Sequence, residues 1–331
     1  MPSRTGLRPR MVAALLGLLV VSLLLAVGVA ASFYGVFALF ADPSIPLAAG
    51  AAALTLGGVG VLEYRSVTSI ERLADAEPVD RETAPDLYGT ATRVAAQLSV
   101  PVPTIALSDR GAPEALVVGF RPNAMHLVLS RGTVEALDDD ELAAVIAYEL
   151  AHVANRDAMV VTAVSLPVVL ADGLRTRTAD VAPRSWAAIL AIPLRLVSTL
   201  VWIAGRTILS RLTRVRERAA DRAAATATGS PAALASALTE LDESIADTPN
   251  RDLRAASGVS SLSILPLQPW EREKVMLGPD GEREPSMWWL TSRLYRLERR
   301  LFGSHPRTED RVASLRALAR DRETVASEPS Q

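Results

Sequence analysis

The chain has 331 residues, 49% of them hydrophobic, and a formal net charge of -2. This composition is too apolar for an ordinary soluble domain. The near-neutral charge and the lack of a basic arm give no support for nucleic-acid binding. There are no cysteines, which excludes disulfides and thiolate metal sites. Any metal must be held by His, Asp, Glu or Tyr, and the chain has only three histidines.

Two long apolar segments near the N-terminus predict a helical membrane hairpin. Residues 11–31 carry no charge and are long enough to cross a bilayer, and residues 44–62 are similarly apolar. The first segment is longer than the apolar core of a signal peptide. Arg4, Arg8 and Arg10 precede it, so we expect the N-terminus to lie in the cytoplasm.

A second pair of apolar segments is less clear. Residues 158–171 are short for a crossing, and residues 185–205 are long enough but contain Arg195. Buried core helices are the alternative interpretation of both. Arginines crowd the end of the last segment, as is typical of a cytoplasmic flank. Four crossings would place residues 64–157 and 206–331 together on the cytoplasmic side.

Between the two pairs, the sequence predicts a helix and a small sheet. The helix covers residues 83–99, where apolar residues recur at helical spacing. Three short strands are predicted at residues 102–109, 114–120 and 125–130. The Arg-Pro-Asn-Ala segment between the last two strands is expected to be a hairpin turn.

The next helix is predicted within residues 137–157, which read LDDDELAAVIAYELAHVANRD. Asp138 and Glu141 are spaced as a capping box at its start. Tyr148 and His152 are four residues apart, so we expect them to be neighbours on one face of this helix.

Beyond the fourth apolar segment, the pattern is again mainly helical. Helices are predicted at residues 214–229, 230–245, 286–302 and 308–321, with loop over 247–285 and a disordered tail from Glu323.

The pentapeptide Tyr148–His152 differs from the zinc-protease signature H-E-x-x-H in its first residue only. A zinc hydrolase needs three protein ligands, an open position for water, and a carboxylate that takes the proton of that water. Two ligands four residues apart on a helix, with Glu after the first, supply most of this set. Glu-x-x-His alone occurs by chance. Glu217, however, is separated from His152 by two crossings, and an even number of crossings returns it to the same side of the membrane.

Three segments of the chain read LDDDELAAVIAYELAHVANRDAMV, RVRERAAD and FGSHPRTEDRVASL. Together they resemble the HtpX family of membrane zinc metalloendopeptidases, relatives of the CAAX prenyl endopeptidases. The resemblance runs from the first hairpin to about residue 320. It implies a mainly α, four-span protein of the plasma membrane, with a cytoplasmic zincin-like (gluzincin) protease domain containing a small β-sheet. It also implies one Zn²⁺ per chain and polypeptide substrates, namely damaged or unassembled membrane proteins.

The resemblance assigns a role to several polar residues. Glu149 matches the general base of the family, His152 its second His ligand and Glu217 its Glu ligand. Asp221 matches the carboxylate that orients a ligand histidine.

A second element of the resemblance lies near the C-terminus. His305 and Arg311 match a His-Pro-x-x-x-x-Arg element that faces the substrate and the tetrahedral oxyanion. In an active member, zinc-bound water activated by Glu149 would attack a peptide carbonyl, and His305 and Arg311 would steady the oxyanion. The alternative for His305 is a loop histidine before proline.

Two residues depart from the family pattern. Tyr148 stands where the first His ligand is expected, and zinc would have to displace the proton of a phenol whose ordinary pKa is about 10. Glu114 stands where the family usually has an Asn that binds substrate backbone on an edge strand. Three outcomes stay open: a weak Tyr-His-Glu zinc site, Glu114 as a substitute ligand, or an empty site.

The sequence therefore predicts a membrane zinc metalloendopeptidase of the HtpX type with impaired catalysis. The alternative is a pseudoprotease that acts as a membrane scaffold for clients, and a chance motif in an unrelated membrane protein is the third reading. The predicted division of the chain is an N-terminal hairpin (1–65), a first protease segment with the metal helix (66–157), a second membrane pair (158–205), a second protease segment (206–322) and a tail (323–331).

Overall fold

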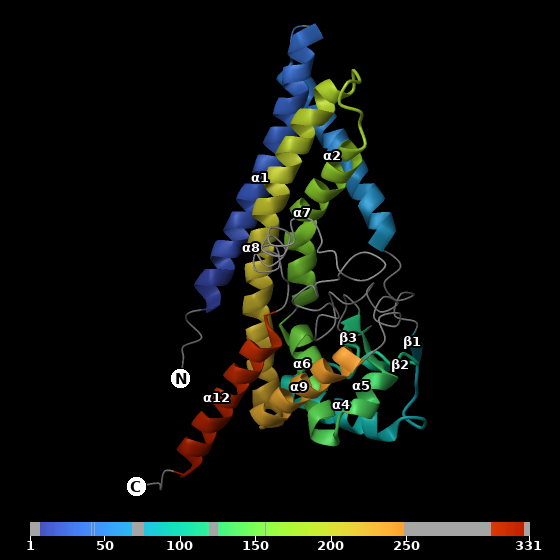
Figure 1. Cartoon of the computed structure of the whole chain (residues 1–331), viewed down its shortest axis with the longest axis vertical. Helices are drawn as coiled ribbons and strands as arrows, with labels where there is room; N and C mark the ends of the chain where they lie inside the picture. Colours follow the sequence, from blue (N-terminus) through green and yellow to red (C-terminus); the bar gives the residue numbers. More distant parts are fainter. Residues whose placement is uncertain are drawn as a thin grey trace, which may run out of the picture. The chain divides into compact units, whose positions relative to one another are not determined.

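The computed structural model describes residues 7–40, 42, 44–67, 76–118, 125–155, 157–247 and 306–327 (Figure 1). The chain divides into two compact units. One consists of Met1–Ser69 and Val160–Leu212, and the other of Ile70–Met159 and Thr213–Gln331. Each unit is therefore built from two stretches of chain that are far apart in the sequence.

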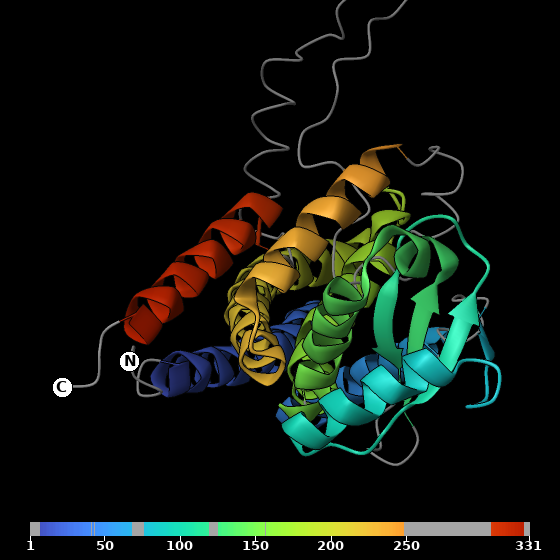
Figure 2. The same ribbon diagram turned by 90° about the horizontal axis from the view of Figure 1, so that it is seen from below.

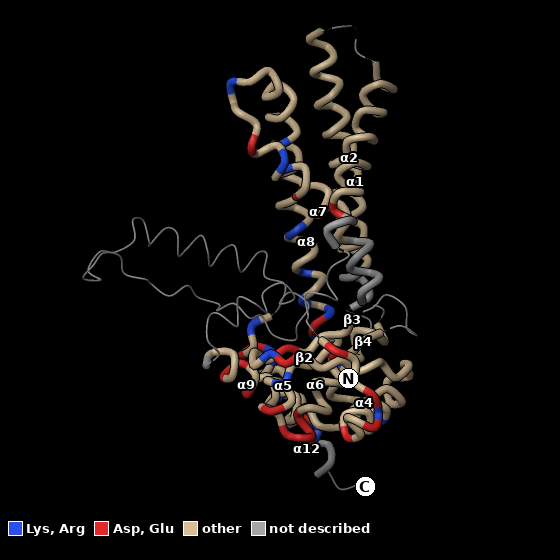
Figure 3. Tube along the Cα trace, turned by 90° about the vertical axis from the view of Figure 1, so that its right-hand side faces the viewer, with Lys and Arg blue, Asp and Glu red and all other residues tan. Residues whose placement is uncertain are grey.

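The described part of the first unit is helical. It contains α1 (Leu7–Phe40), α2 (Ile45–Val67), most of α7 (Asp157–Ala179) and the first part of α8 (Ala188–Thr228). Figure 3 shows that α1 and α2 carry very few charged residues. Among the described residues, three helices are long and apolar enough to cross a membrane, Val12–Phe40, Ile45–Glu63 and Ala188–Thr228. Three of the four predicted spans are therefore candidate membrane helices. The remaining predicted span, residues 158–171, lies within α7, which is not one of these three helices.

Glycines allow close approach of the helices in the first unit. A Cβ atom at Gly28 of α1 would lie 2.4 Å from Cγ1 of Val197 on α8. A Cβ atom at Gly205 of α8 would lie 2.7 Å from Cγ2 of Val168 on α7. A side chain in either place would force the facing valine to shift, and small residues at helix crossings are typical of membrane bundles. The buried apolar side chains around these crossings include Val21, Leu25, Val29, Ala171, Leu174, Leu194 and Val201.

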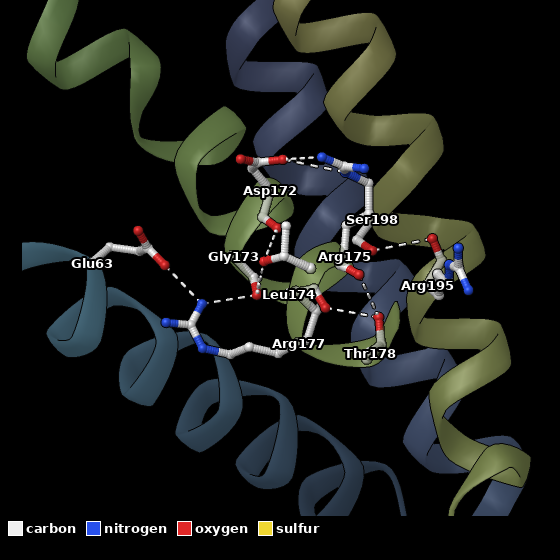
Figure 4. Close-up of polar contacts among 10 residues, drawn as sticks. Glu63, Asp172, Gly173, Leu174, Arg175, Arg177, Thr178, Arg195 and Ser198 are labelled. Carbon is white, nitrogen blue, oxygen red and sulfur yellow. Dashed lines mark hydrogen bonds and ion pairs between the residues drawn. The ribbon is translucent and has the colours of Figure 1, made fainter. Parts of the chain in front are cut away.

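Polar contacts also link α7 to its neighbours in the first unit (Figure 4). Arg177 Nη1 donates to Glu63 Oε1 of α2 at 2.7 Å and to the carbonyl of Gly173 at 2.8 Å. The guanidinium carbon of Arg175 lies 4.7 Å from the ring centroid of Trp202 on α8. Helix α7 is therefore held by charged side chains on two sides.

The second unit contains a mixed sheet of four described strands. In the order β1-β2-β4-β3, these are β1 (Ala76–Pro78), β2 (Thr104–Ser108), β4 (His126–Ser130) and β3 (Ala115–Val118). Strands β2 and β4 are parallel, whereas β1–β2 and β3–β4 are antiparallel. The three predicted strands are confirmed with slightly shorter bounds. Strand β1 was not predicted, because three residues are too few to show an alternating pattern.

Helices cover this sheet and bury the core. They are α4 (Pro85–Leu98), α5 (Arg131–Ala136), α6 (Asp139–Ala154), α9 (Pro231–Asp247) and α12 (Thr308–Ser327), together with the end of α8. Figure 2 shows α6 between the sheet and α9, with α12 beside α9. Helix α6 is the centre of the unit, and every residue from Leu142 to Ala151 is buried.

The predicted capping box of α6 is confirmed. The Asp138 side chain accepts from the Glu141 backbone N–H at 2.8 Å, and the Glu141 side chain accepts from the Asp138 backbone N–H at 3.1 Å. These bonds satisfy backbone donors that a helix start otherwise leaves without partners. The residue at which α6 begins is therefore determined by its own local sequence.

Two predicted boundaries are wrong. Residues 214–229 are not a separate helix but the last part of α8, because no breaker interrupts the pattern after the fourth apolar segment. Helix α12 continues to Ser327, past the tail predicted to be disordered from Glu323. Arg322 anchors this end by donating to the Ala225 carbonyl of α8 at 2.9 Å. The predicted loop 247–285 (from residue 248 on), the predicted helix 286–302 and His305 lie outside the described residues.

Candidate functional site

Helix α6 carries three of the predicted site residues. Tyr148 and Glu149 are buried, with 1% and 3% of their surface exposed, and His152 is half-buried. The rings of Tyr148 and His152 meet edge to face with their centroids 4.8 Å apart. They are neighbours along α6, as the spacing of four residues predicts.

Helices α8 and α12 bring three more predicted residues to the same place. Glu217 and Asp221 lie one turn apart on α8, and Arg311 lies in the first turn of α12. All three are buried, with 4%, 6% and 2% exposed. The Tyr148 hydroxyl donates a hydrogen bond to Oε2 of Glu217. This bond joins residues that are 69 positions apart in the sequence.

Asp221 has a different partner from the one expected. The histidine that such a carboxylate would orient is replaced by Tyr148, and the Tyr148 hydroxyl points to Glu217 instead. Arg311 binds Asp221 with two donors, Nε at 3.2 Å from Oδ2 and Nη2 at 2.7 Å from Oδ1. The Arg311 guanidinium also lies 4.7 Å from the centroid of the Tyr148 ring. The structure thus joins Tyr148, Glu217, Asp221 and Arg311 into one network.

Burial and, after it, neighbouring charges shift several pKa values in the site. Burial, and then the charge of Glu217, raise the pKa of Glu149 well above its ordinary value, although a hydrogen bond from the Val117 backbone N–H lowers it. Burial and the charge of Glu217 likewise raise the pKa of Tyr148. Burial lowers the pKa of Arg311, but the charges around it raise that pKa more. The phenol of Tyr148 therefore stays protonated, and Arg311 stays charged.

The carboxylate of Glu149 does not use all of its hydrogen-bonding capacity within the described residues. One of its carboxylate oxygens, Oε1, is buried and has no hydrogen-bond partner in the described part of the chain. The carboxylate accepts a hydrogen bond from Val117, which lies on the edge strand β3. Helix α6 and strand β3 are thereby tied together at the candidate site.

The residues present do not fit a zinc ion. Two ligands on a tetrahedral zinc, each about 2.0–2.2 Å from the metal, stand roughly 3.3 Å apart. The Tyr148 hydroxyl and the Glu217 carboxylate are hydrogen-bonded directly to one another, which leaves no room for an ion between them. Across the described ranges, no three His, Asp or Glu side chains are grouped so that they could hold a metal.

Glu114 lies in a separate polar network. It is fully buried, and its Oε2 is 3.1 Å from Nη1 of Arg110. Its backbone N–H donates to Ser130 Oγ at 2.8 Å, and its carbonyl accepts from Thr133 Oγ1 at 2.9 Å. Burial raises the pKa of Glu114, and Arg110 partly offsets this. The carboxylate is engaged by Arg110, so this geometry gives no support for a substitute metal ligand.

Sequence reasoning missed the partner choices in both networks. The spacing of Arg110 and Glu114 was visible, but it indicates a contact only in a helix, and this segment is not helical. The pairing of Arg311 with Asp221 joins residues 90 positions apart and has no local signal.

Glu149 and His152 lie on α6, and Glu217 and Asp221 lie on α8, so two of the three segments that carry the sequence resemblance meet in the structure. A family model described as "Peptidase family M48" matches residues 81–319. The chain therefore belongs to peptidase family M48.

Curated relatives carry names of one protease type. "Protease HtpX homolog" of Moorella thermoacetica is 31% identical over 275 residues, which cover 80% of this chain and 82% of that protein. "Protease HtpX homolog 1" of Streptomyces coelicolor is 37% identical over 195 residues. That match covers 57% of this chain and only 64% of the relative. The resemblance to the HtpX family is confirmed.

A solved structure also resembles this chain weakly. The structure titled "Crystal Structure of S. mikatae Ste24p" aligns with a TM-score of 0.45 and 16% identity. The match covers 86% of this chain and 60% of that one. A likeness of this size does not establish a shared fold.

Proposed function

We propose that this protein is a membrane-embedded member of family M48 that binds polypeptide clients and has lost zinc-dependent peptide hydrolysis. Membership of a peptidase family supports binding of polypeptides. The hydrogen bond between the Tyr148 hydroxyl and Glu217 supports the loss of hydrolysis, because it joins two groups that a zinc ion would have to separate.

Strand β3 offers a surface for an extended client. It is an edge strand that pairs with β4 alone among the described strands. Apart from the Val117 N–H, which donates to Glu149, backbone groups on its other edge can pair with an added strand, which is a common mode of peptide recognition. Clients of a membrane-embedded family member would be unfolded or unassembled membrane proteins.

Peptide-bond hydrolysis is the second candidate function. It is favoured by Glu149, whose buried carboxylate has one oxygen without a hydrogen-bond partner among the described residues and a raised pKa. Buried acceptors normally have partners, and perturbed carboxylates of this kind cluster at catalytic sites. Glu149 would then act as the base that takes a proton from water.

Zinc content and proteolysis together distinguish the two functions. The purified full chain and its Tyr148→His variant are dialysed against zinc and then assayed on casein. We expect the wild type to retain no stoichiometric zinc and to leave casein intact, and the variant to retain about one zinc per chain. Replacing His152 with alanine in the variant is the control, and it should abolish retention. Stoichiometric zinc and casein cleavage by the wild type would refute the proposal.

We also propose that the chain crosses the plasma membrane four times, with its N-terminus and second unit in the cytoplasm. Helix α7 has 23 residues, or about 34 Å of helix, so it is long enough for a crossing, although only residues 158–171 within it form an uncharged stretch. The chain has no cysteines, so single cysteines can report the topology. Ala182→Cys should react with a membrane-impermeant maleimide on intact cells, and Ala246→Cys only after lysis. The reverse pattern would refute this topology.

A further inference from the structure

Arg311 contacts both halves of the candidate site. Its Nε and Nη2 atoms bind the two oxygens of Asp221, and its guanidinium lies against the ring of Tyr148. Only 2% of its surface is exposed. It enters from α12, whereas Asp221 is on α8 and Tyr148 on α6.

The burial of Arg311 requires these partners. Removing a guanidinium from water is costly, and a bidentate carboxylate offsets that cost only in well-defined geometry. The face of an aromatic ring adds a favourable contact with a cation. The position of Arg311 is therefore fixed by Asp221 on one side and by the Tyr148 ring on the other.

The Arg311–Asp221 and Tyr148–Glu217 hydrogen bonds both hold α8, at positions one turn apart. Asp221 and Glu217 are four residues apart and share a face, so Arg311 holds one of them while the Tyr148 hydroxyl holds the other. Arg311 also brings a positive charge next to buried carboxylates. Both features, a cross-link between helices and a neutralising charge, are what a bound metal ion supplies in other proteins.

We infer that Arg311 is a positioning residue that keeps the Tyr148 hydroxyl on Glu217, so that the Arg311–Asp221 and Tyr148–Glu217 pairs link α12, α8 and α6 without a metal ion. This inference rests on the proposed function, since it states what holds the site together when zinc is lost. It assigns to Arg311 a role other than oxyanion stabilisation.

Thermal unfolding and ¹⁹F NMR of the full chain in detergent test this role. The chain has five tyrosines, so 3-fluorotyrosine labelling gives few lines, and the line lost in Tyr148→Phe identifies Tyr148. Breaking a buried ion pair costs enough to lower Tm by about 10 °C in a unit of this size. We expect Arg311→Met to lower Tm by about this amount and to shift the Tyr148 line.

Arg131→Gln is the matched control. Arg131 pairs with Asp109, but both side chains are largely exposed, at 62% and 91%. Exposed pairs contribute little, so we expect Tm to change by at most about 2 °C and the Tyr148 line to stay in place. Arg311→Lys serves if Arg311→Met does not fold. It keeps the charge but not the bidentate geometry, and it should shift the Tyr148 line with a smaller loss of Tm.

Because Arg311 touches the Tyr148 ring, Tyr148→Phe is also made in the Arg311→Met background, where it should lower Tm less than it does in the wild type. An equal loss in the two backgrounds, or an unchanged Tyr148 line in a destabilised Arg311 variant, would overturn the inference, because Arg311 would then have a packing role only. A loss of Tm no larger than that of Arg131→Gln would overturn it as well. Neither readout depends on whether the wild type binds zinc or cleaves casein, so failure of the proposed function is seen separately.

Discussion

Tyr148→Phe removes a single hydroxyl from the candidate site. That hydroxyl is buried and donates to the carboxylate of Glu217. A hydrogen bond to a charged group contributes about 1.5–3 kcal/mol to stability. For a unit of roughly 200 residues, 1 kcal/mol corresponds to about 2–4 °C in Tm. We therefore expect Tyr148→Phe to lower the Tm of the second unit by about 3–12 °C.

The Tm of the second unit is measured by hydrogen exchange during heating, in peptides from α6 and from the end of α8 beyond residue 212. Tyr88→Phe is the matched control for removal of a tyrosine hydroxyl. The Tyr88 hydroxyl donates to the backbone carbonyl of Val79 at 2.9 Å and accepts from the backbone N–H of Ile105 at 3.2 Å, and both bonds join neutral groups. Each such bond contributes about 0.5–1.5 kcal/mol, so Tyr88→Phe should also lower Tm, but by the same amount in the wild type and in a Glu217→Gln background.

A double-mutant cycle makes the prediction specific to the Tyr148–Glu217 pair. In the Glu217→Gln background the acceptor is neutral, so removing the Tyr148 hydroxyl should cost about half as much. Equal costs in the two backgrounds, or a Tyr148→Phe variant as stable as the wild type, would show that the hydroxyl does not hold Glu217.

Three further predictions concern other parts of the chain. The folded-state pKa values of Glu114 and Glu149 are both raised, so wild-type stability should fall as pH rises from about 4.5, and pH-dependent urea unfolding of Glu114→Gln should show a smaller fall because the Glu114 contribution is removed. A Cβ at Gly173 would lie 2.6 Å from Glu63 Oε1, so Gly173→Ala should lower Tm in detergent, whereas Gly57→Ala, with nothing within 4 Å of its Cβ, should not. Asp138→Ala removes the N-cap of α6 and should lower stability to urea by about 1 kcal/mol.

Local sequence signals were sufficient wherever a short segment determines its own structure. The capping box at Asp138 and Glu141 and the three strands were predicted and are confirmed. The continuation of α8 through residues 214–229 was missed, because the change from apolar to charged residues resembled a boundary although it carries no helix-breaking residue. Strand β1 was missed because its three residues pair with β2 through tertiary contact alone.

Sequence patterns alone were enough to identify the family, the helix of the candidate site and the residue that departs from the family pattern. Tyr148, Glu149 and His152 lie within five residues, and a periodic pattern places them on one helix. The hydrogen-bond partner of Tyr148 could be found only from the three-dimensional arrangement of the helices. The candidates, Glu217 and Asp221, are one turn apart on α8, and no sequence rule distinguishes them. Arg311 binds Asp221 with two donors, and the hydroxyl of Tyr148 is directed to Glu217 because the buried donors and acceptors must be satisfied together.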